Sequence, residues 1–211
     1  MTASGGLPGE LIGGWRASGS GAEMDVEYGF SCMGYELAGA WGAAMARETG
    51  VVTTLLGDGS YLMLNSELFS AAFAGHGFVA VVCDNDGYAV IDRLQRGNGA
   101  PAFNNMYADA RSRQERPPRV DFASHAAALG CAVLAPRDLD ELPAAYAQAR
   151  AHAREGRVAV VVIHTHPSSW TDAGAWWEVG VPEYSTYPAV TDAREDLDKA
   201  KSDQVRYLGR P

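Results

Sequence analysis

Two short polar turns carry the residue types that could bind a metal ion and a phosphate group. Gly57-Asp58-Gly59-Ser60 follows one apolar run, Asp84-Asn85-Asp86-Gly87 follows another, and Asn85 stands 27 positions after Asp58. Carboxylate, amide and carbonyl oxygens suit Mg²⁺, which commonly completes its octahedral shell with phosphate and water. A helix starting near Ser60 would direct free N–H groups to the same place and favour a phosphate there. Each turn alone is more simply an ordinary tight turn, so the prediction of a site depends on the pair.

The strands that precede the two turns indicate that the turns lie close together. Four short runs rich in β-branched residues are apolar on both faces, as central parallel strands are. They are residues 51–56, 78–83, 131–135 and 158–164. Helical patterns alternate with them at residues 34–48, 64–75, 121–130 and 138–156. The alternation predicts an α/β fold with a doubly wound parallel sheet. In such sheets ligands bind beyond the carboxyl ends of the strands, which is where both turns fall.

The composition indicates one soluble domain over residues 1–211. The chain is 47% hydrophobic and 20% charged, which is typical of a globular protein with a core. Its formal net charge of −9 argues against non-specific binding to nucleic acid or to an anionic membrane. No stretch approaches the roughly 20 apolar residues of a membrane span, and the N-terminus lacks the pattern of a signal peptide. Cys32, Cys83 and Cys131 are widely spaced, so free thiols in a reducing cytoplasm are the simplest interpretation.

Two regions depart from the alternation of strands and helices. Residues 92–119 are polar and rich in arginine, glycine and proline, and a lid loop is expected there. Residues 167–211 are expected to form a C-terminal tail, extended at first and ending in a helix from residue 192. Trp176 and Trp177 in this tail could line a substrate site, although packing of the tail explains them at least as well.

The spacing from GDG to Asn85, in the phrases GDGSYLMLNSE and DNDGY, resembles the cofactor motif of thiamine diphosphate enzymes. The resemblance implies a thiamine diphosphate-binding fold. It also implies that Asp58, Asn85 and the carbonyl of Gly87 hold Mg²⁺, which in turn holds the diphosphate of the cofactor. The other residues that it places at the cofactor near these turns are Gly57, Gly59, Ser60 and Tyr88.

A second phrase, EYGFSCMGYELAGA, resembles the segment that lies under the cofactor rings in this family. It implies that Met33 supports the bent cofactor and that the backbone around Ser31 and Met33 hydrogen-bonds the aminopyrimidine ring. Taken alone, Met33 is better explained by core packing. At the start of the first helix, Gly6, Leu7 and Pro8 are implied to lie near the diphosphate.

Together with GGLPGEL, VDFA and AWWEV, these phrases resemble the C-terminal third of the trihydroxycyclohexanedione hydrolases of inositol catabolism. The resemblance implies a ring-opening hydrolysis of a cyclic dione. Two alternatives stay open. One is an acetolactate synthase-like decarboxylase or carboligase, and the other is a non-catalytic remnant or regulatory subunit.

The family resemblance also implies a second domain, which binds the pyrimidine ring and supplies a glutamate that lets the cofactor lose a ring proton. Glu23, Glu27 and Glu36 lie near the second phrase, but none matches that role by motif, so no catalytic residue is assigned. Only three residues precede Ser4, where the fold should have a strand, and a gene fragment or one subunit of a split enzyme is expected. The expected partner is a pyrimidine-binding domain or subunit within a homo- or hetero-oligomer.

The remaining candidate is a histidine pair at the end of the last strand run. His164 and His166 share one face of that strand and could bind zinc. No third ligand is evident in the sequence, so a solvated strand end is the better explanation.

Overall fold

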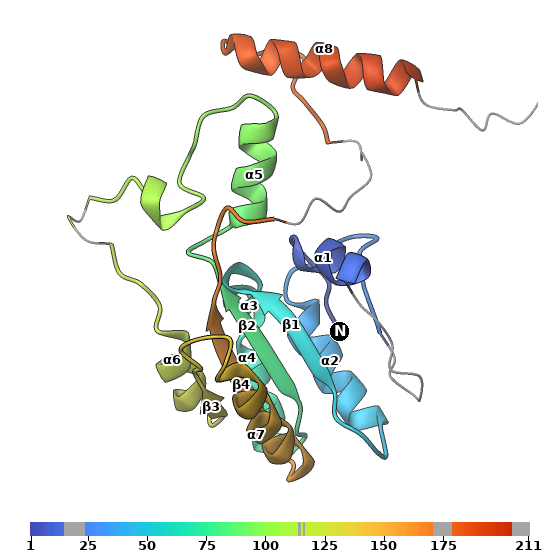
Figure 1. The fold of residues 1–211 in the computed structure, drawn as a ribbon, viewed down its shortest axis with the longest axis vertical. Helices are drawn as coiled ribbons and strands as arrows, with labels where there is room; N and C mark the ends of the chain where they lie inside the picture. The colour runs from blue at the N-terminus through green and yellow to red at the C-terminus, as the bar shows by residue number, and fades with distance from the viewer. Residues whose placement is uncertain (15–23, 114, 116, 171–178, 204–211) are drawn as a thin grey trace, which may run out of the picture.

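The fold is a four-stranded parallel sheet with helices on both faces (Figure 1). The computed structural model describes residues 1–14, 24–113, 115, 117–170 and 179–203. Its strands lie in the order β1 (Thr53–Gly57), β2 (Val79–Asp84), β4 (Ala159–His164) and β3 (Ala132–Leu134), and each neighbouring pair is parallel. The predicted doubly wound α/β sheet is confirmed.

Successive residues of a strand pack on opposite faces of the sheet. On β2, Val82 belongs to the larger core cluster and Val81 to the smaller one. The larger cluster is covered by α2 (Tyr35–Ala46), α3 (Asp58–Leu64), α4 (Ser66–Ala74) and α6 (Phe122–Ala128), and the smaller one by α7 (Leu142–Arg154). Because both faces are covered, the strands need apolar residues at successive positions, which is the pattern of their sequence.

Several elements begin at other residues than the sequence predicts. α3 begins at Asp58 rather than at 64, directly after β1, and Asn65 separates it from α4. The predicted helix 138–156 begins only at Leu142. The carboxylate of Asp138 accepts the backbone N–H groups of Asp140 and Glu141 and holds a turn there instead.

The predicted lid loop over 92–119 contains regular structure. The first residues of this range belong to the helix α5 (Ala89–Gly97), and the 3₁₀ turn η1 (Tyr107–Asp109) follows. The sequence pattern concealed α5 because two of its apolar residues, Val90 and Ile91, precede the polar stretch. The predicted last helix is α8 (Pro188–Asp203), which begins beside Gly99. Trp176 and Trp177 lie outside the described residues.

The first residues of the chain lie along the outer edge of β1, and α1 (Leu7–Gly14) follows them. The Met1 ammonium donates to the carbonyl of Thr53 at 2.7 Å, and the N–H of Leu55 donates to the carbonyl of Met1 at 2.9 Å. This segment, where the sequence analysis expects a leading strand, therefore lies beside β1 and pairs with it through Met1. None of the helices in the described part of the chain has the length and hydrophobicity needed to cross a bilayer.

We expect Leu56→Ala to lower the free energy of unfolding by about 2–5 kcal/mol, because it opens a cavity in the core. Leu56 is fully buried in β1. Leu139→Ala is the matched control, since Leu139 is 82% exposed, and it should change the stability by less than about 0.5 kcal/mol. Urea unfolding followed by tryptophan fluorescence measures both variants. Equal losses would contradict the assignment of Leu56 to the core.

Candidate functional site

A cavity of about 370 Å³ lies at the carboxyl ends of β1, β2 and β4. The predicted site residues that line it are Gly6, Leu7, Ser31, Met33, Gly57, Asp58, Gly59, Ser60, Asn85, Gly87 and Tyr88. Pro8 does not line the cavity and is buried in the first turn of α1. A larger cavity, of about 610 Å³, lies between α2 and the start of β1 and contains none of these residues. The structure thus brings nearly all the predicted residues to one place.

The carboxylate of Asp58 joins the two polar turns. Its Oδ1 accepts the N–H of Gly59 at 2.9 Å, and its Oδ2 accepts the N–H of Gly87 at 2.8 Å. Asp58 is buried, and this burial raises the pKa of its carboxyl to about 6. The two N–H donors oppose that rise, and the nearby charge of Asp84 reinforces it. A cation beside this carboxylate would therefore lower the free-energy cost of burying its negative charge, which the two N–H donors offset only in part.

The side-chain amide of Asn85 reaches both Asp58 and the carbonyl group of Gly87. The end of its side-chain amide lies 3.2 Å from Oδ1 of Asp58 and 2.7 Å from the carbonyl oxygen of Gly87. With the amide oxygen on that side, three acceptors face one another and need a cation between them. With the amide turned by half a rotation, its nitrogen donates to both oxygens instead. Carboxylate, amide and carbonyl oxygens are the donors that Mg²⁺ prefers, so the residues present fit this metal.

Backbone hydrogen bonds to the segment after α5 fix the turn that contains Gly87. The N–H of Tyr88 donates to the carbonyl of Asn105 at 2.8 Å, and the N–H of Tyr107 donates to the carbonyl of Asp86 at 3.0 Å. Gly87 has a φ of +139°, and a Cβ there would collide with the carbonyl oxygen of Asn105. The predicted lid is therefore part of the support of this turn.

Met33 and Tyr88 approach the Asp58 turn from two sides. Met33 is 37% exposed and lines the cavity, so core packing does not explain it. A Cβ on Gly59 would lie 2.6 Å from Cε1 of Tyr88 and 3.3 Å from Cε of Met33. Glycine at position 59 therefore allows both side chains to lie against the turn.

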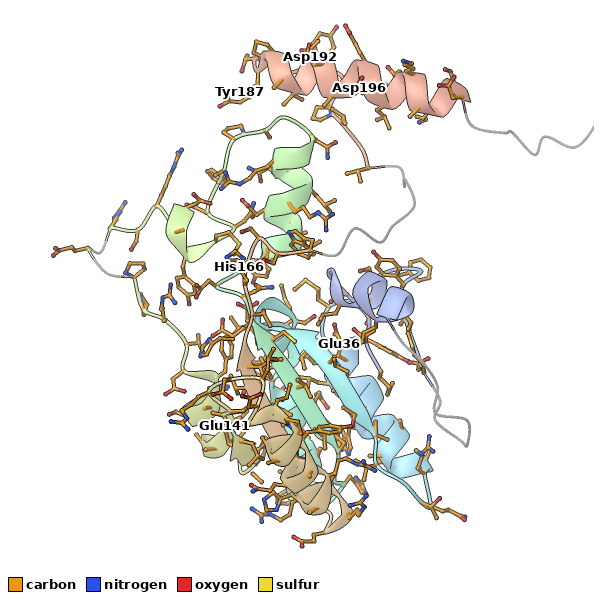
Figure 2. All side chains as sticks on the ribbon, in the orientation of Figure 1. Glu36, Glu141, His166, Tyr187, Asp192 and Asp196 are labelled. Atoms are coloured by element: carbon orange, nitrogen blue, oxygen red, sulfur yellow. The ribbon has the colours of Figure 1, made fainter. Side chains whose placement is uncertain are left out.

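Two parts of the cavity wall were not predicted. The segment after β4 contributes Thr165, His166, Ser169 and Trp170, and Figure 2 shows His166 at the end of that strand. α5 contributes Val90, Ile91 and Leu94. The order β1-β2-β4 brings the end of β4 to the cavity, and this order is not encoded in any local pattern of the sequence.

The histidine pair does not form a zinc site in the described part of the chain. His164 Nδ1 lies 3.3 Å from Oδ2 of Asp84, whereas His166 Nδ1 lies 3.0 Å from Oγ of Ser169. Across residues 1–14, 24–113, 115, 117–170 and 179–203, no group of three or more His, Cys, Asp or Glu side chains is arranged to hold a metal. Among the described residues that line the cavity, His166 is the only histidine, lysine or arginine.

Glu36 is a further polar residue that the sequence did not single out. It was one of three acidic residues near Met33, and it is fully buried at the start of α2, where Figure 2 labels it. Its Oε1 accepts the hydroxyl of Ser60 at 3.0 Å. A buried charged residue cannot be recognised from sequence when its donors come from distant segments, as they do here.

A profile described as "Thiamine pyrophosphate enzyme, C-terminal TPP binding domain" matches residues 14–163. The chain is 34% identical to the 3D-(3,5/4)-trihydroxycyclohexane-1,2-dione hydrolase of Clostridium botulinum (strain Eklund 17B / Type B), over 97% of this chain and 32% of that protein. It is also 34% identical to the protein of the same name from Bacillus cereus (strain AH820), over 95% of this chain and 32% of that protein. The chain thus spans about a third of the length of these relatives.

Two solved structures share the fold. The benzoylformate decarboxylase of Polynucleobacter necessarius superposes with a TM-score of 0.53 at 23% identity, over 64% of this chain and 24% of that one. The thiamine diphosphate-dependent 4-hydroxybenzoylformate decarboxylase of Rhodococcus jostii RHA1 gives a TM-score of 0.51 at 22% identity, over 64% and 23% of the two chains. At these identities the likeness concerns the fold alone.

Gly87→Ala should destabilise the protein by about 1–3 kcal/mol, since alanine strains the positive φ and its Cβ meets the backbone of Asn105. Gly57→Ala is the control, because a Cβ there meets nothing within 4 Å, and its effect should stay within about 0.5 kcal/mol. Chemical denaturation of both variants tests the prediction. A Gly87→Ala protein as stable as the parent would show that this turn is not fixed as described.

Proposed function

The chain belongs to the thiamine pyrophosphate enzymes as their C-terminal cofactor-binding domain, and from this premise we propose that its cavity holds the diphosphate of thiamine diphosphate through Mg²⁺. Asp58, Asn85 and the carbonyl of Gly87 would hold the metal. The observation that carries the proposal is that the side-chain amide of Asn85 reaches both Oδ1 of Asp58 and the carbonyl oxygen of Gly87, so that three ligand oxygens meet in the cavity wall when its oxygen faces them. The backbone at Gly57 and Gly59 would lie against the diphosphate.

The charge balance of the cavity supports a metal-bridged diphosphate. Asp58 is the only acidic residue among the described residues that line the cavity, and none of these residues is a lysine or an arginine. A diphosphate brought to this place without a cation would be repelled by the carboxylate. A divalent ion between the two reverses the sign of that interaction.

The apolar part of the cavity wall suits the cofactor rings. Met33 and Tyr88 present apolar surface beside the Asp58 turn, and the backbone near Ser31 offers polar groups beside Met33. Thiamine diphosphate supplies a nucleophilic carbon that adds to a substrate carbonyl group. The residues of this chain bind and orient the cofactor, and no acid or base for the reaction is assigned among them.

The activity that we infer for the assembled enzyme is the ring-opening hydrolysis of a cyclic dione. Its support is the name shared by the relatives that cover 95% or more of this chain. Because the chain spans about a third of those proteins, we infer that a pyrimidine-binding domain or subunit completes the site and that the assembly is an oligomer. We also infer that this enzyme acts in the cytoplasm and that residues 1–211 form one domain.

Asp58→Ala should abolish Mg²⁺-dependent binding of thiamine diphosphate, because the only acidic member of the proposed metal set is removed. The parent chain is expected to bind weakly, and only with Mg²⁺, since one side of the ring pocket belongs to another domain. Asp140→Ala is the control, with an exposed carboxylate away from the cavity. Isothermal titration calorimetry with and without EDTA measures the effect. An Asp58→Ala protein that binds like the parent would refute the metal assignment.

We expect this chain by itself to lack dione hydrolase activity and to self-associate. Large apolar side chains are exposed on the segment before α2 and on α3 and α4, and such patches are association sites. They are Phe30, Met33, Leu62, Met63, Phe69 and Phe73. An assay of cyclic dione opening, run beside light scattering, tests both expectations. A monodisperse monomer that turns over the dione unaided contradicts them, whereas activity after addition of a separately expressed pyrimidine domain supports the proposed partner.

A further inference from the structure

Glu36 is a fully buried carboxylate whose described hydrogen-bond donors are backbone and hydroxyl groups. Its Oε1 accepts the N–H of Ser4 at 3.1 Å, the hydroxyl of Ser4 at 2.9 Å and the hydroxyl of Ser60 at 3.0 Å. Its Oε2 accepts the N–H of Gly34 at 3.0 Å. The two hydroxyl oxygens also lie 2.7 Å apart. Two N–H groups and two hydroxyl groups therefore lie against one carboxylate, and the two hydroxyl protons are shared among Glu36, Ser4 and Ser60.

The donors belong to three separate segments of the cavity wall. Ser4 precedes Gly5 and Gly6, which line the cavity before α1, and Gly34 directly follows Met33. Ser60 is the last residue of the GDGS turn and lies in the first turn of α3. One carboxylate thus ties together the proposed diphosphate turn, the loop before α1 and the segment that presents Met33.

This position needs an acid rather than an amide. A carboxylate accepts hydrogen bonds on both oxygens, whereas an amide accepts on one and donates on the other. With glutamine at position 36, its NH₂ group would face either the N–H of Gly34 or the donors of Ser4 and Ser60. At least one segment would lose its bond, and its buried donor would be left unsatisfied.

The same contacts define what Ser60 offers to a ligand. Its hydroxyl lies within hydrogen-bond distance of both Glu36 and Ser4, so the hydroxyl proton is engaged inside this cluster. The backbone of Ser60 is then the part that remains for the diphosphate.

We infer that Glu36 is a positioning residue of the proposed cofactor site. It fixes the spacing between the diphosphate turn and the Met33 segment before the cofactor arrives. The inference rests on the proposed function where it concerns thiamine diphosphate, and it rests on the hydrogen bonds alone where it concerns the fastening of the three segments.

Glu36→Gln is the decisive variant, and Tyr61→Phe is its matched control. Tyr61 is equally buried in α3 and contributes one hydrogen bond, to Nδ1 of His125, but it does not line the cavity. Two quantities are measured on the parent and on both variants. They are the amide hydrogen exchange of Ser4 and Gly34 without cofactor, and the affinity for thiamine diphosphate with Mg²⁺ by calorimetry.

In Glu36→Gln the exchange of Gly34 or Ser4 should become at least about tenfold faster, and the affinity should fall by about tenfold, the equivalent of one lost buried hydrogen bond. Tyr61→Phe should change neither quantity, even where it lowers the melting temperature as much. Unchanged exchange in Glu36→Gln overturns the inference, as does a loss of affinity no greater than that of Tyr61→Phe. A parent chain that binds no cofactor would refute the proposed function, and the exchange data would still decide whether Glu36 fastens the segments.

Discussion

The site depends on the parallel pairing of β1 and β2 in one particular register. Gly57 lies opposite Cys83, so the residues that follow both strands leave the sheet at the same edge. This register brings Asp58 close enough for its carboxylate to accept the N–H of Gly87 at 2.8 Å. A slip by one residue would turn every side chain of the strand to the other face of the sheet. The apolar pattern of the strands therefore specifies the geometry of the proposed metal site as well as the core.

Asp58 links the stability of the fold to the proposed metal. Burial raises the pKa of its carboxyl from 3.8 to about 6. The stability that the neutral carboxyl contributes is therefore fully present below pH 3.8 and is lost as the pH rises through about 6. At neutral pH the buried carboxylate destabilises the metal-free fold. A divalent cation that bound only the folded chain would restore stability, so binding of the proposed metal would be coupled to folding at this residue.

The sequence predicted the elements that depend on local pattern. The four strands, the doubly wound sheet and the two polar turns could be predicted because apolar runs and glycine-rich turns are local features. The place of His166 in the cavity wall could not be predicted, because it follows from the pairing of β2 with β4. α5 was not predicted because its apolar residues precede residue 92, whereas its polar residues lie in the polar stretch that begins there. Glu36 was overlooked because its burial results from donors as distant as Ser4 and Ser60.

The two sides of the cavity are held by different kinds of interaction. On the strand side, the buried Asp58 accepts the N–H of the buried Gly59 and that of the half-buried Gly87, and the buried Ser60 is hydrogen-bonded to the buried Ser4. On the Met33 side, the carboxylate of the half-exposed Glu27 accepts the N–H groups of Phe30 and Cys32 at 3.0 and 3.1 Å and shapes the loop before Met33. These two bonds lower the pKa of Glu27, but water competes for them. A partner domain that covered Phe30, which is 90% exposed, would exclude that water and strengthen both bonds. The side proposed for the diphosphate is therefore formed by the chain itself, whereas the side proposed for the rings would gain rigidity from a domain that covered it.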